Sequence, residues 1–247
     1  MKQERIIMTM PTVVDIADVG ATQEIFDEVF NYLVSIDERF SVYKKNSEIT
    51  LYNGGKIKEA DLSEDMKKVF ALAGDMKRKT NGYFDINLDG RIDPSGLVKG
   101  WAIYNASLIL RKKGFKNFYV EIAGDIEVAG HNAQGEKWAI GIRNPFNRNE
   151  NVKVLYLSDC GIATSGTYEN GEHIYNPVDG GKANEIESIT IIGPNVYEAD
   201  CFATASFAMG KNGINFIEGL DGFEGYMIDH NGVATFTSNF EQYVKDN

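Results

Sequence analysis

Apolar residues recur at intervals of three and four along several segments of the chain. Residues 22–40 predict an amphipathic helix with Thr22 as its N-cap, because one face collects Ile25, Phe26, Val29, Phe30, Leu33 and Ile36. Residues 63–80 predict a second helix capped by Ser63, and a third helix begins near Gly96 and ends at Gly114. A further helix is predicted from about Glu198.

Other stretches alternate between apolar and polar residues and are rich in β-branched side chains. Residues 5–18 predict one strand, and strands bounded by Gly, Asn and Pro turns are also predicted at 117–130, 137–145, 152–159 and 187–194. Residues 225–237 predict a hairpin with Asn231-Gly232 as its turn. Helices mixed with hairpin-linked strands predict the α+β class with largely antiparallel sheets, and the lack of a linker predicts one domain over residues 1–247.

Composition and charge narrow the classes of function. The chain has 36 acidic and 25 basic residues, a formal net charge of -11, which disfavours a nucleic-acid partner because phosphate contacts need a basic surface. No apolar run approaches the roughly 20 residues of a membrane span, so we expect no membrane insertion. The N-terminal residues lack a signal-peptide pattern and a lipidation cysteine, and Cys160 and Cys201 form no CxxC motif, so we expect a cytoplasmic protein.

An acid and a hydroxyl share one face of the apolar helix near residue 200. Asp200 and Thr204 are four residues apart, which places them on the same side of a helix. Carboxylate and hydroxyl oxygens are hard ligands that suit Mg²⁺, which commonly completes its shell with waters and substrate phosphate oxygens. The alternative, favoured by these two residues taken alone, is a helix-capping Asp200 with Thr204 bonded to the carbonyl four residues earlier.

A glycine-flanked lysine follows an acid near residue 93. Asp93 and Ser95 precede the predicted helix, and Gly96 and Gly100 lie on either side of Lys99. Glycines let a backbone approach a phosphate closely, a helix N-terminus favours anions, and the lysine adds a positive charge. The alternative is an ordinary capped helix start with a solvated lysine.

Small polar residues gather between positions 164 and 173. Thr164, Ser165 and Gly166 follow the end of a strand, and we predict a loop that contacts phosphate. His173 lies in a polar, turn-rich segment and is a candidate acid or base, although a plain hairpin loop is the alternative. We predict that His131 and His230 are surface residues.

Aromatic residues beside polar ones mark two further segments. Tyr43 could stack on a heterocyclic ring, with plain packing as the alternative for it and for Tyr52. Ser47, between them, predicts the cap of a short helix. Asp85 follows two aromatic residues and could hydrogen-bond a ligand, or belong to a simple loop.

Taken in order, these segments resemble the ApbE family, the FAD:protein FMN transferases. The resemblance covers almost the whole chain and rests on Met-x-Thr at Met10, RFSVYKKNSEITLYN, NGYFD, D-x-x-G-x-x-KG-x-A, IAGDIEVAG, W-x-IGIRNP, IATSG, H-I-x-x-P-x-x-G and AD-x-x-AT-x-x-F-x-MG. It implies an α+β architecture related to the T-fold, FAD as substrate and Mg²⁺ or Mn²⁺ as cofactor. It also implies a reaction in which a threonine hydroxyl of a target flavoprotein attacks the FMN-side phosphorus, AMP leaves, and FMN becomes linked to the target.

The resemblance assigns roles to residues at matching positions. Asp200 and Thr204 resemble the family's metal ligands, with the backbone oxygen of Gly96 as a third. His173 matches the histidine expected to deprotonate the target threonine, and Lys99 would neutralise charge on the phosphates. The remaining positions that match FAD contacts are Met10, Tyr43, Tyr83, Phe84, Asp85, Asp93, Thr164 and Ser165.

The chain also departs from the family's pattern. Pro11 stands where Met-Gly-Thr has glycine, and Tyr104 and Asn176 stand at usual aspartates. Only seven residues separate Asp85 from Asp93, where family members commonly carry a longer insert, so we expect a compact version with a more open adenine pocket. Two alternatives are an Mg²⁺-dependent FAD pyrophosphatase, with water as the attacker, and a flavin-binding protein without catalysis. We predict the transferase, because His173 favours protein transfer over hydrolysis and the joint presence of Asp200, Thr204, Lys99 and His173 argues against a protein without catalysis.

Overall fold

One large antiparallel sheet organises the computed structural model, which describes residues 1–88, 90–167, 176–181 and 183–244. Its eight strands lie in the order β1 (Lys2–Ile7), β2 (Met10–Ile16), β5 (Phe118–Ile122), β6 (Asp125–Ala129), β9 (Cys160–Gly166), β10 (Ile186–Gly193), β11 (Glu224–Asp229) and β12 (Ala234–Phe236). Every neighbouring pair runs antiparallel. The predicted residue His173 lies outside the described residues.

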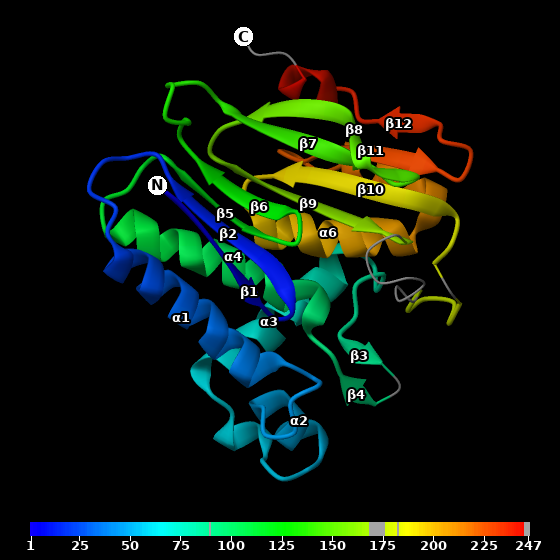
Figure 1. Cartoon of the computed structure of the whole chain (residues 1–247). Helices are drawn as coiled ribbons and strands as arrows, with labels where there is room; N and C mark the ends of the chain where they lie inside the picture. The colour runs from blue at the N-terminus through cyan, green and yellow to red at the C-terminus, as the bar shows by residue number, and fades with distance from the viewer. Residues whose placement is uncertain (89, 168–175, 182, 245–247) are drawn as a thin grey trace.

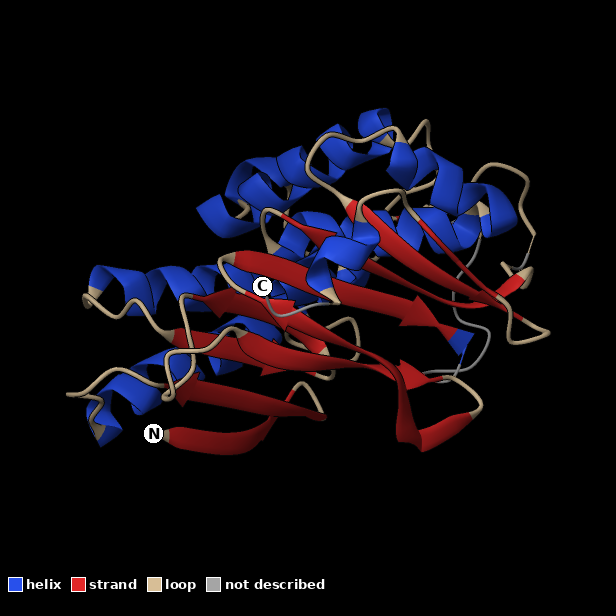
Figure 2. Cartoon of the chain, turned by 90° about the horizontal axis from the view of Figure 1, so that it is seen from above, coloured by secondary structure: helices blue, strands red, loops and turns tan. Residues whose placement is uncertain are grey.

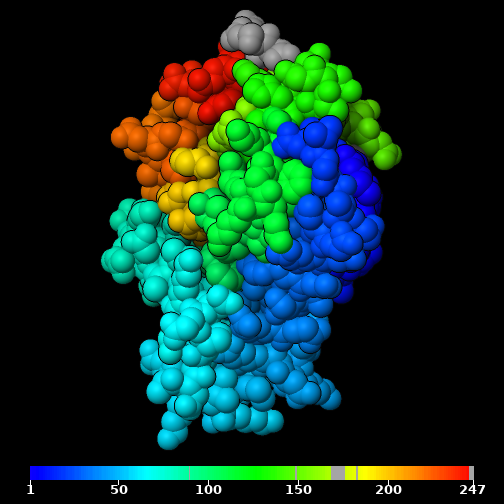
Figure 3. All heavy atoms as spheres, turned by 90° about the vertical axis from the view of Figure 1, so that its left-hand side faces the viewer, coloured from blue at the N-terminus to red at the C-terminus, as the bar shows by residue number. Residues whose placement is uncertain are grey.

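The main helices cover one face of this sheet (Figures 1 and 2). They are α1 (Gln23–Phe40), α3 (Glu64–Lys79), α4 (Ser95–Lys112), α6 (Val196–Ala208) and α7 (Gly213–Glu218), with the short α2 (Glu48–Asn53). Helix α2 and the 3₁₀ turn Glu59–Asp61 form one end of the molecule, opposite the C-terminal 3₁₀ turn Phe240–Tyr243 (Figure 3). A small hairpin of β3 (Asn87–Leu88) and β4 (Arg91–Ile92) projects beside the helices.

The opposite face of the sheet carries a separate two-stranded ribbon. Strands β7 (Trp138–Asn144) and β8 (Asn147–Leu157) pair with each other and lie over the sheet (Figure 1). A core between helices and sheet contains Phe30, Leu97 and Phe118, whereas a second core contains Trp138, Leu155 and Phe240. The central strands of the sheet are therefore buried on both faces, because residues that alternate along them enter the two cores in turn.

Most predicted elements are confirmed, including the helix caps at two serines. Ser63 accepts a hydrogen bond from the Met66 amide, and Ser47 accepts one from the Thr50 amide. Thr22 does occupy the N-cap position of α1, but its hydroxyl donates to Glu24 and caps no amide. The hairpin around Asn231-Gly232 is also confirmed.

Three predictions of local structure were wrong in detail. Residues 117–130 form two strands, β5 and β6, not one, because Ala123-Gly124 makes a turn. Residues 5–18 form two strands, not one, because Met8 and Thr9 make a tight turn with φ of 53° and 63°. The stretch Thr164-Ser165-Gly166, predicted as a loop, belongs to strand β9 and pairs with β10. In the part of the chain that the structure describes, none of the helices combines the length and apolar character that crossing a bilayer requires.

Candidate functional site

Helices α4 and α6 pack against each other beneath the sheet (Figure 1), and their contact is close at Gly100. A β-carbon at Gly100 would lie 2.8 Å from the Cα of Tyr197 and 2.9 Å from the Cβ of Asp200. Only glycine leaves room for this approach. The close contact brings the N-terminal half of α4 against the first turns of α6.

Three oxygen-bearing groups meet at this contact. The carboxylate of Asp200 is 4% exposed, and its Oδ2 accepts a hydrogen bond of 3.0 Å from the backbone N–H of Gly100. In an α-helix the same N–H faces the carbonyl oxygen of Gly96, four residues earlier. The hydroxyl oxygen of Thr204, one turn after Asp200, lies 3.6 Å from a β-carbon built on Gly96. The Asp200 carboxylate and the Thr204 hydroxyl therefore lie one turn apart on α6, against the turn of α4 that runs from Gly96 to Gly100.

This donor set fits a hard divalent cation. Carboxylate, hydroxyl and carbonyl oxygens are ligands that Mg²⁺ accepts, while waters and phosphate oxygens complete its shell. Among the described residues no three His, Cys, Asp or Glu side chains form a metal-binding group. A cation here would therefore depend on the hydroxyl, the carbonyl and the oxygens of a bound ligand. The capping alternative for Asp200 does not hold, because Asn195 caps α6 and accepts from the Glu198 amide.

Lys99 points from α4 toward the sheet and is not a solvated lysine. Its side chain is 18% exposed, and its ammonium lies 2.7 Å from Oδ2 of Asp125 at the start of β6. The other oxygen of Asp125 accepts a hydrogen bond of 3.0 Å from the Thr164 amide on β9. The side chain of Thr164 instead meets the hydroxyl of Thr190, at 2.8 Å, while its neighbour Ser165 is buried.

The residues before α4 shape its first turn. Asp93 accepts hydrogen bonds from the backbone N–H and the hydroxyl of Ser95, so its carboxylate orders the helix start. The ring of Phe84 is 2% exposed and lies 3.4 Å from a β-carbon built on Gly96. Tyr83 is partly buried beside it, and Asp85 forms an ion pair of 2.6 Å with Lys77.

Two other predicted contacts differ strongly in their exposure. Met10 is partly buried at the start of β2 and follows the Met8–Thr9 turn. Tyr43 is 93% exposed and lies before α2.

Both histidines predicted at the surface are exposed there, and His230 forms an ion pair of 2.7 Å with Glu187, which raises the pKa of His230.

Two carboxylates of β6 lie in this region, and the sequence analysis assigned no role to either. Asp125 and Glu127 alternate within the apolar stretch IAGDIEVAG, so both face the helices. Glu127 is 2% exposed and accepts a hydrogen bond of 2.8 Å from the amide of Val196, the first residue of α6. Burial raises the pKa of Glu127 to about 7. The sequence did contain a signal for them: two acids occupy alternate positions of an apolar strand, and a buried carboxylate needs a partner.

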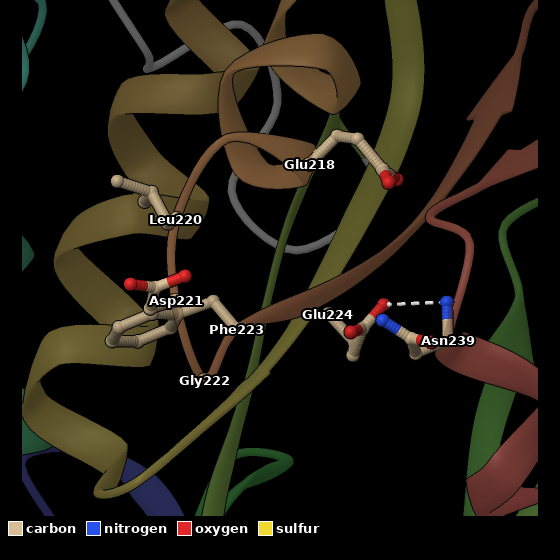
Figure 4. A pocket seen from close by; sticks show the side chains of 7 residues that line it. All are labelled: Glu218, Leu220, Asp221, Gly222, Phe223, Glu224 and Asn239. Atoms are coloured by element: carbon tan, nitrogen blue, oxygen red, sulfur yellow. Dashed lines mark hydrogen bonds between the residues drawn. The ribbon is translucent and has the colours of Figure 1, made fainter.

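Two hollows on the described surface lie away from the α4–α6 contact. One is lined by acidic and polar residues that include Glu218, Asp221 and Glu224, and there Glu224 accepts a hydrogen bond from the Asn239 amide (Figure 4). The other is lined in part by Trp101, Tyr104 and Tyr197. Neither hollow contains Asp200, Thr204 or Lys99, so the chemistry of the side chains, rather than concavity, identifies the candidate site.

Comparisons with known proteins agree with this architecture. A FAD:protein FMN transferase from Haemophilus influenzae is 24% identical over 91% of this chain and 85% of that protein. One from Vibrio cholerae is 32% identical, but the alignment covers 49% of this chain and 39% of that protein. The solved flavin transferase ApbE from Vibrio cholerae matches with a TM-score of 0.85 at 22% identity over 98% of both chains. The ApbE protein from Thermotoga maritima matches with a TM-score of 0.89 at 20% identity over 99% of both chains.

The two structural matches confirm the predicted α+β fold with mostly antiparallel sheets. The family model of ApbE matches residues 8–91 and 87–227, which together include every described residue of the α4–α6 contact. On these grounds the chain belongs to the ApbE family.

Proposed function

We propose that this protein is an Mg²⁺-dependent FAD:protein FMN transferase that modifies a threonine of a target flavoprotein and releases AMP. The observation that carries the proposal is the placement of Asp200 and Thr204 against the Gly96–Gly100 turn of α4, the same turn that carries Lys99. The names of the relatives supply the reaction class. A diphosphate ligand supplies the oxygens that this small donor set lacks.

The proposed roles follow from the chemistry of each group. Asp200, Thr204 and the Gly96 carbonyl would hold Mg²⁺, which supplies positive charge to the phosphate oxygens when bound. Lys99, at the N-terminal half of α4, adds a second positive charge on the sheet side. Phe84 packs against Gly96 and excludes water from that side of the helix.

The transfer itself conserves atoms and charge. The target hydroxyl oxygen forms a bond to the FMN-side phosphorus of FAD, and the bond from that phosphorus to the bridging oxygen breaks. AMP leaves with the bridging oxygen, and the hydroxyl proton passes to a base. His173 is our proposed base, because an unperturbed imidazole titrates near pH 6.5.

Intact mass spectrometry of a candidate target tests this function. A flavoprotein domain with an acceptor threonine is incubated with this protein, FAD and Mg²⁺, with chelator and with a Thr→Val target as controls. We expect a metal-dependent mass gain of one FMN on the target and an equal amount of AMP. AMP with free FMN and an unmodified target would favour the FAD pyrophosphatase, and unchanged FAD would overturn both enzymatic functions.

The variant His173→Ala tests the proposed base. We expect transfer to fall by about 10²- to 10⁴-fold, the usual contribution of general-base catalysis, while FAD affinity is retained. Single-turnover transfer rates and flavin fluorescence titrations measure the two effects separately. Transfer at the wild-type rate would show that another group accepts the proton.

A further inference from the structure

A buried carboxylate on β6 lies next to the proposed phosphate-binding lysine. Asp125 is the first residue of β6 and follows a two-residue turn, Ala123-Gly124, in which both residues have positive φ (51° and 96°). The Ala123 amide donates a hydrogen bond of 3.0 Å to the Pro11 carbonyl of β2, which ties the turn to the neighbouring strand. The position of Asp125 is therefore set by the sheet.

Both oxygens of Asp125 are directed at other elements. Oδ1 accepts from the Thr164 amide of β9, and Oδ2 lies 2.7 Å from the Lys99 ammonium of α4. The side chain of Asp125 is 2% exposed, so its charge is withdrawn from water and needs this partner. One carboxylate thereby joins two strands of the sheet to the helix that begins at the site.

The contact with Asp125 gives the Lys99 ammonium a defined position. A lysine has a flexible four-carbon stem, and a solvated ammonium samples many positions. Oδ2 makes no well-directed hydrogen bond among the described residues, so the contact is an ion pair. The ion pair therefore fixes the position of the Lys99 ammonium. It fixes the directions of the N–H groups less strongly.

The place of Lys99 in α4 connects this pair to the proposed reaction. Lys99 directly precedes Gly100, whose amide contacts Asp200, and follows Gly96 by three residues. We infer that Asp125 is a positioning residue for the transfer, which holds the Lys99 ammonium beside the phosphates of the dinucleotide. This inference rests on the proposed function, because it assigns Lys99 a phosphate ligand.

Glu127 provides a matched comparison on the same strand. It faces the helices two residues after Asp125 and is equally buried, but it contacts the Val196 amide and lies 3.7 Å from Arg111. Removing its charge also perturbs a buried carboxylate of β6, without touching the pair that Lys99 forms with Asp125.

The test measures Lys99 directly as well as the reaction. In Asp125→Asn the side chain keeps its shape and can still accept from the Thr164 amide, but it carries no charge. We expect acylation of Lys99 by an amine-directed ester, quantified by peptide mass spectrometry, to rise severalfold. We also expect kcat/KM for FMN transfer to fall about 10- to 100-fold, mainly in kcat, as for other displaced reacting groups. Glu127→Gln should leave Lys99 acylation at the wild-type level.

A second variant covers the case in which Asp125→Asn does not fold. Asp125→Glu restores the charge one methylene further along, so Lys99 acylation should stay low while kcat/KM recovers only in part. Wild-type kcat/KM in either variant overturns the inference, and so does wild-type acylation in Asp125→Asn.

A failure of the proposed function would be recognised separately. If the wild-type protein transfers no FMN to any target, affinity for FAD with Mg²⁺, measured by flavin fluorescence, replaces kcat/KM. Asp125→Asn must then both raise Lys99 acylation and weaken FAD binding, and unchanged binding overturns the inference.

Discussion

A β-carbon at Gly100 would meet atoms that cannot move aside. Besides the Cα of Tyr197 it would lie 2.9 Å from the Val196 carbonyl oxygen, and both belong to the backbone of α6. The glycine therefore sets the distance between the two helices that carry the candidate site. Its role could not be read from the sequence, where Gly100 was assigned to phosphate approach.

We expect Gly100→Ala to lower the free energy of unfolding by about 1 to 3 kcal/mol, as overpacking does. Gly74→Ala in α3 is a matched control, because its β-carbon would meet only a flexible Arg78 nitrogen at 3.9 Å. That variant should gain about 0.5 to 1 kcal/mol from helix propensity. Urea denaturation of both variants decides, and a stability gain at Gly100 would contradict the close packing.

The buried carboxylate of Glu127 makes stability depend on pH. Its pKa is about 7 in the folded protein, raised from 4.5 by burial, so between these values the folded state binds more protons than the unfolded chain. Stability then falls as pH rises through this window and stays lower above it. The effect is on the order of 3 kcal/mol, because the pKa rises from 4.5 to about 7 on folding.

Replacing Glu127 by glutamine removes this dependence while keeping an acceptor for the Val196 amide. We expect the free energy of unfolding of Glu127→Gln, relative to that of the wild type, to increase as the pH rises from 5 to 8. Denaturant titrations at both pH values, on both proteins, measure the difference. Parallel pH profiles would show that the carboxyl titrates at its ordinary value.

At the level of elements, the sequence predicted helix caps more reliably than turns. Ser47 and Ser63 were found because a hydroxyl before an amphipathic stretch has one favourable partner, the amide three residues on. The turn at Met8-Thr9 was missed because it contains neither glycine nor asparagine. The place of Thr164 and Ser165 in strand β9, where Ser165 is buried, was missed because pairing with β10 is a tertiary contact. The local sequence around them has the composition of a loop.

The β1–β2 turn can be tested by giving it the residues that such turns prefer. Both central residues have positive φ, as in a type I′ turn, which favours Asn-Gly and penalises a β-branched residue. We expect Met8→Asn with Thr9→Gly to raise the free energy of unfolding by about 1 kcal/mol. Thr22→Gly is the control, since φ at Thr22 is -117° and glycine relieves nothing there. A loss of stability in the double variant would mean that Met8 contributes more by packing.

At the level of the whole molecule, the sheet separates a core on its helix face from a second core on its opposite face. The chain has two tryptophans, and each lies in one core. Trp101 follows Gly100 on α4 and packs against Phe40, at a centroid distance of 5.8 Å. Trp138 is the first residue of the ribbon strand β7 on the far face, and its indole N–H donates to the Ala129 carbonyl at 3.0 Å. The sequence predicted the strands and the helices. It did not predict on which face of the sheet each core would lie.

We expect Trp138→Phe to cost about 1 to 3 kcal/mol of stability, because the Ala129 carbonyl loses its donor. The rate of FMN transfer per folded molecule should not change, since Trp138 lies in the core on the sheet face opposite the helices. Trp101→Phe should lower both stability and transfer. Thermal melts and transfer assays on the two variants test this division, and a slower transfer in Trp138→Phe would show coupling through the sheet.

The hydrogen bond from Gly100 to Asp200 also provides a natural spectroscopic probe. Its amide proton is donated to a side chain of another helix, so solvent exchange of that proton requires the helices to separate. Glycine amides resonate in a distinct ¹⁵N region, and this one reports the electron density of the carboxylate. A cation that binds Asp200 would shift the Gly100 signal without any label being introduced. One backbone resonance could thus follow both the opening of the helix pair and the occupancy of the site.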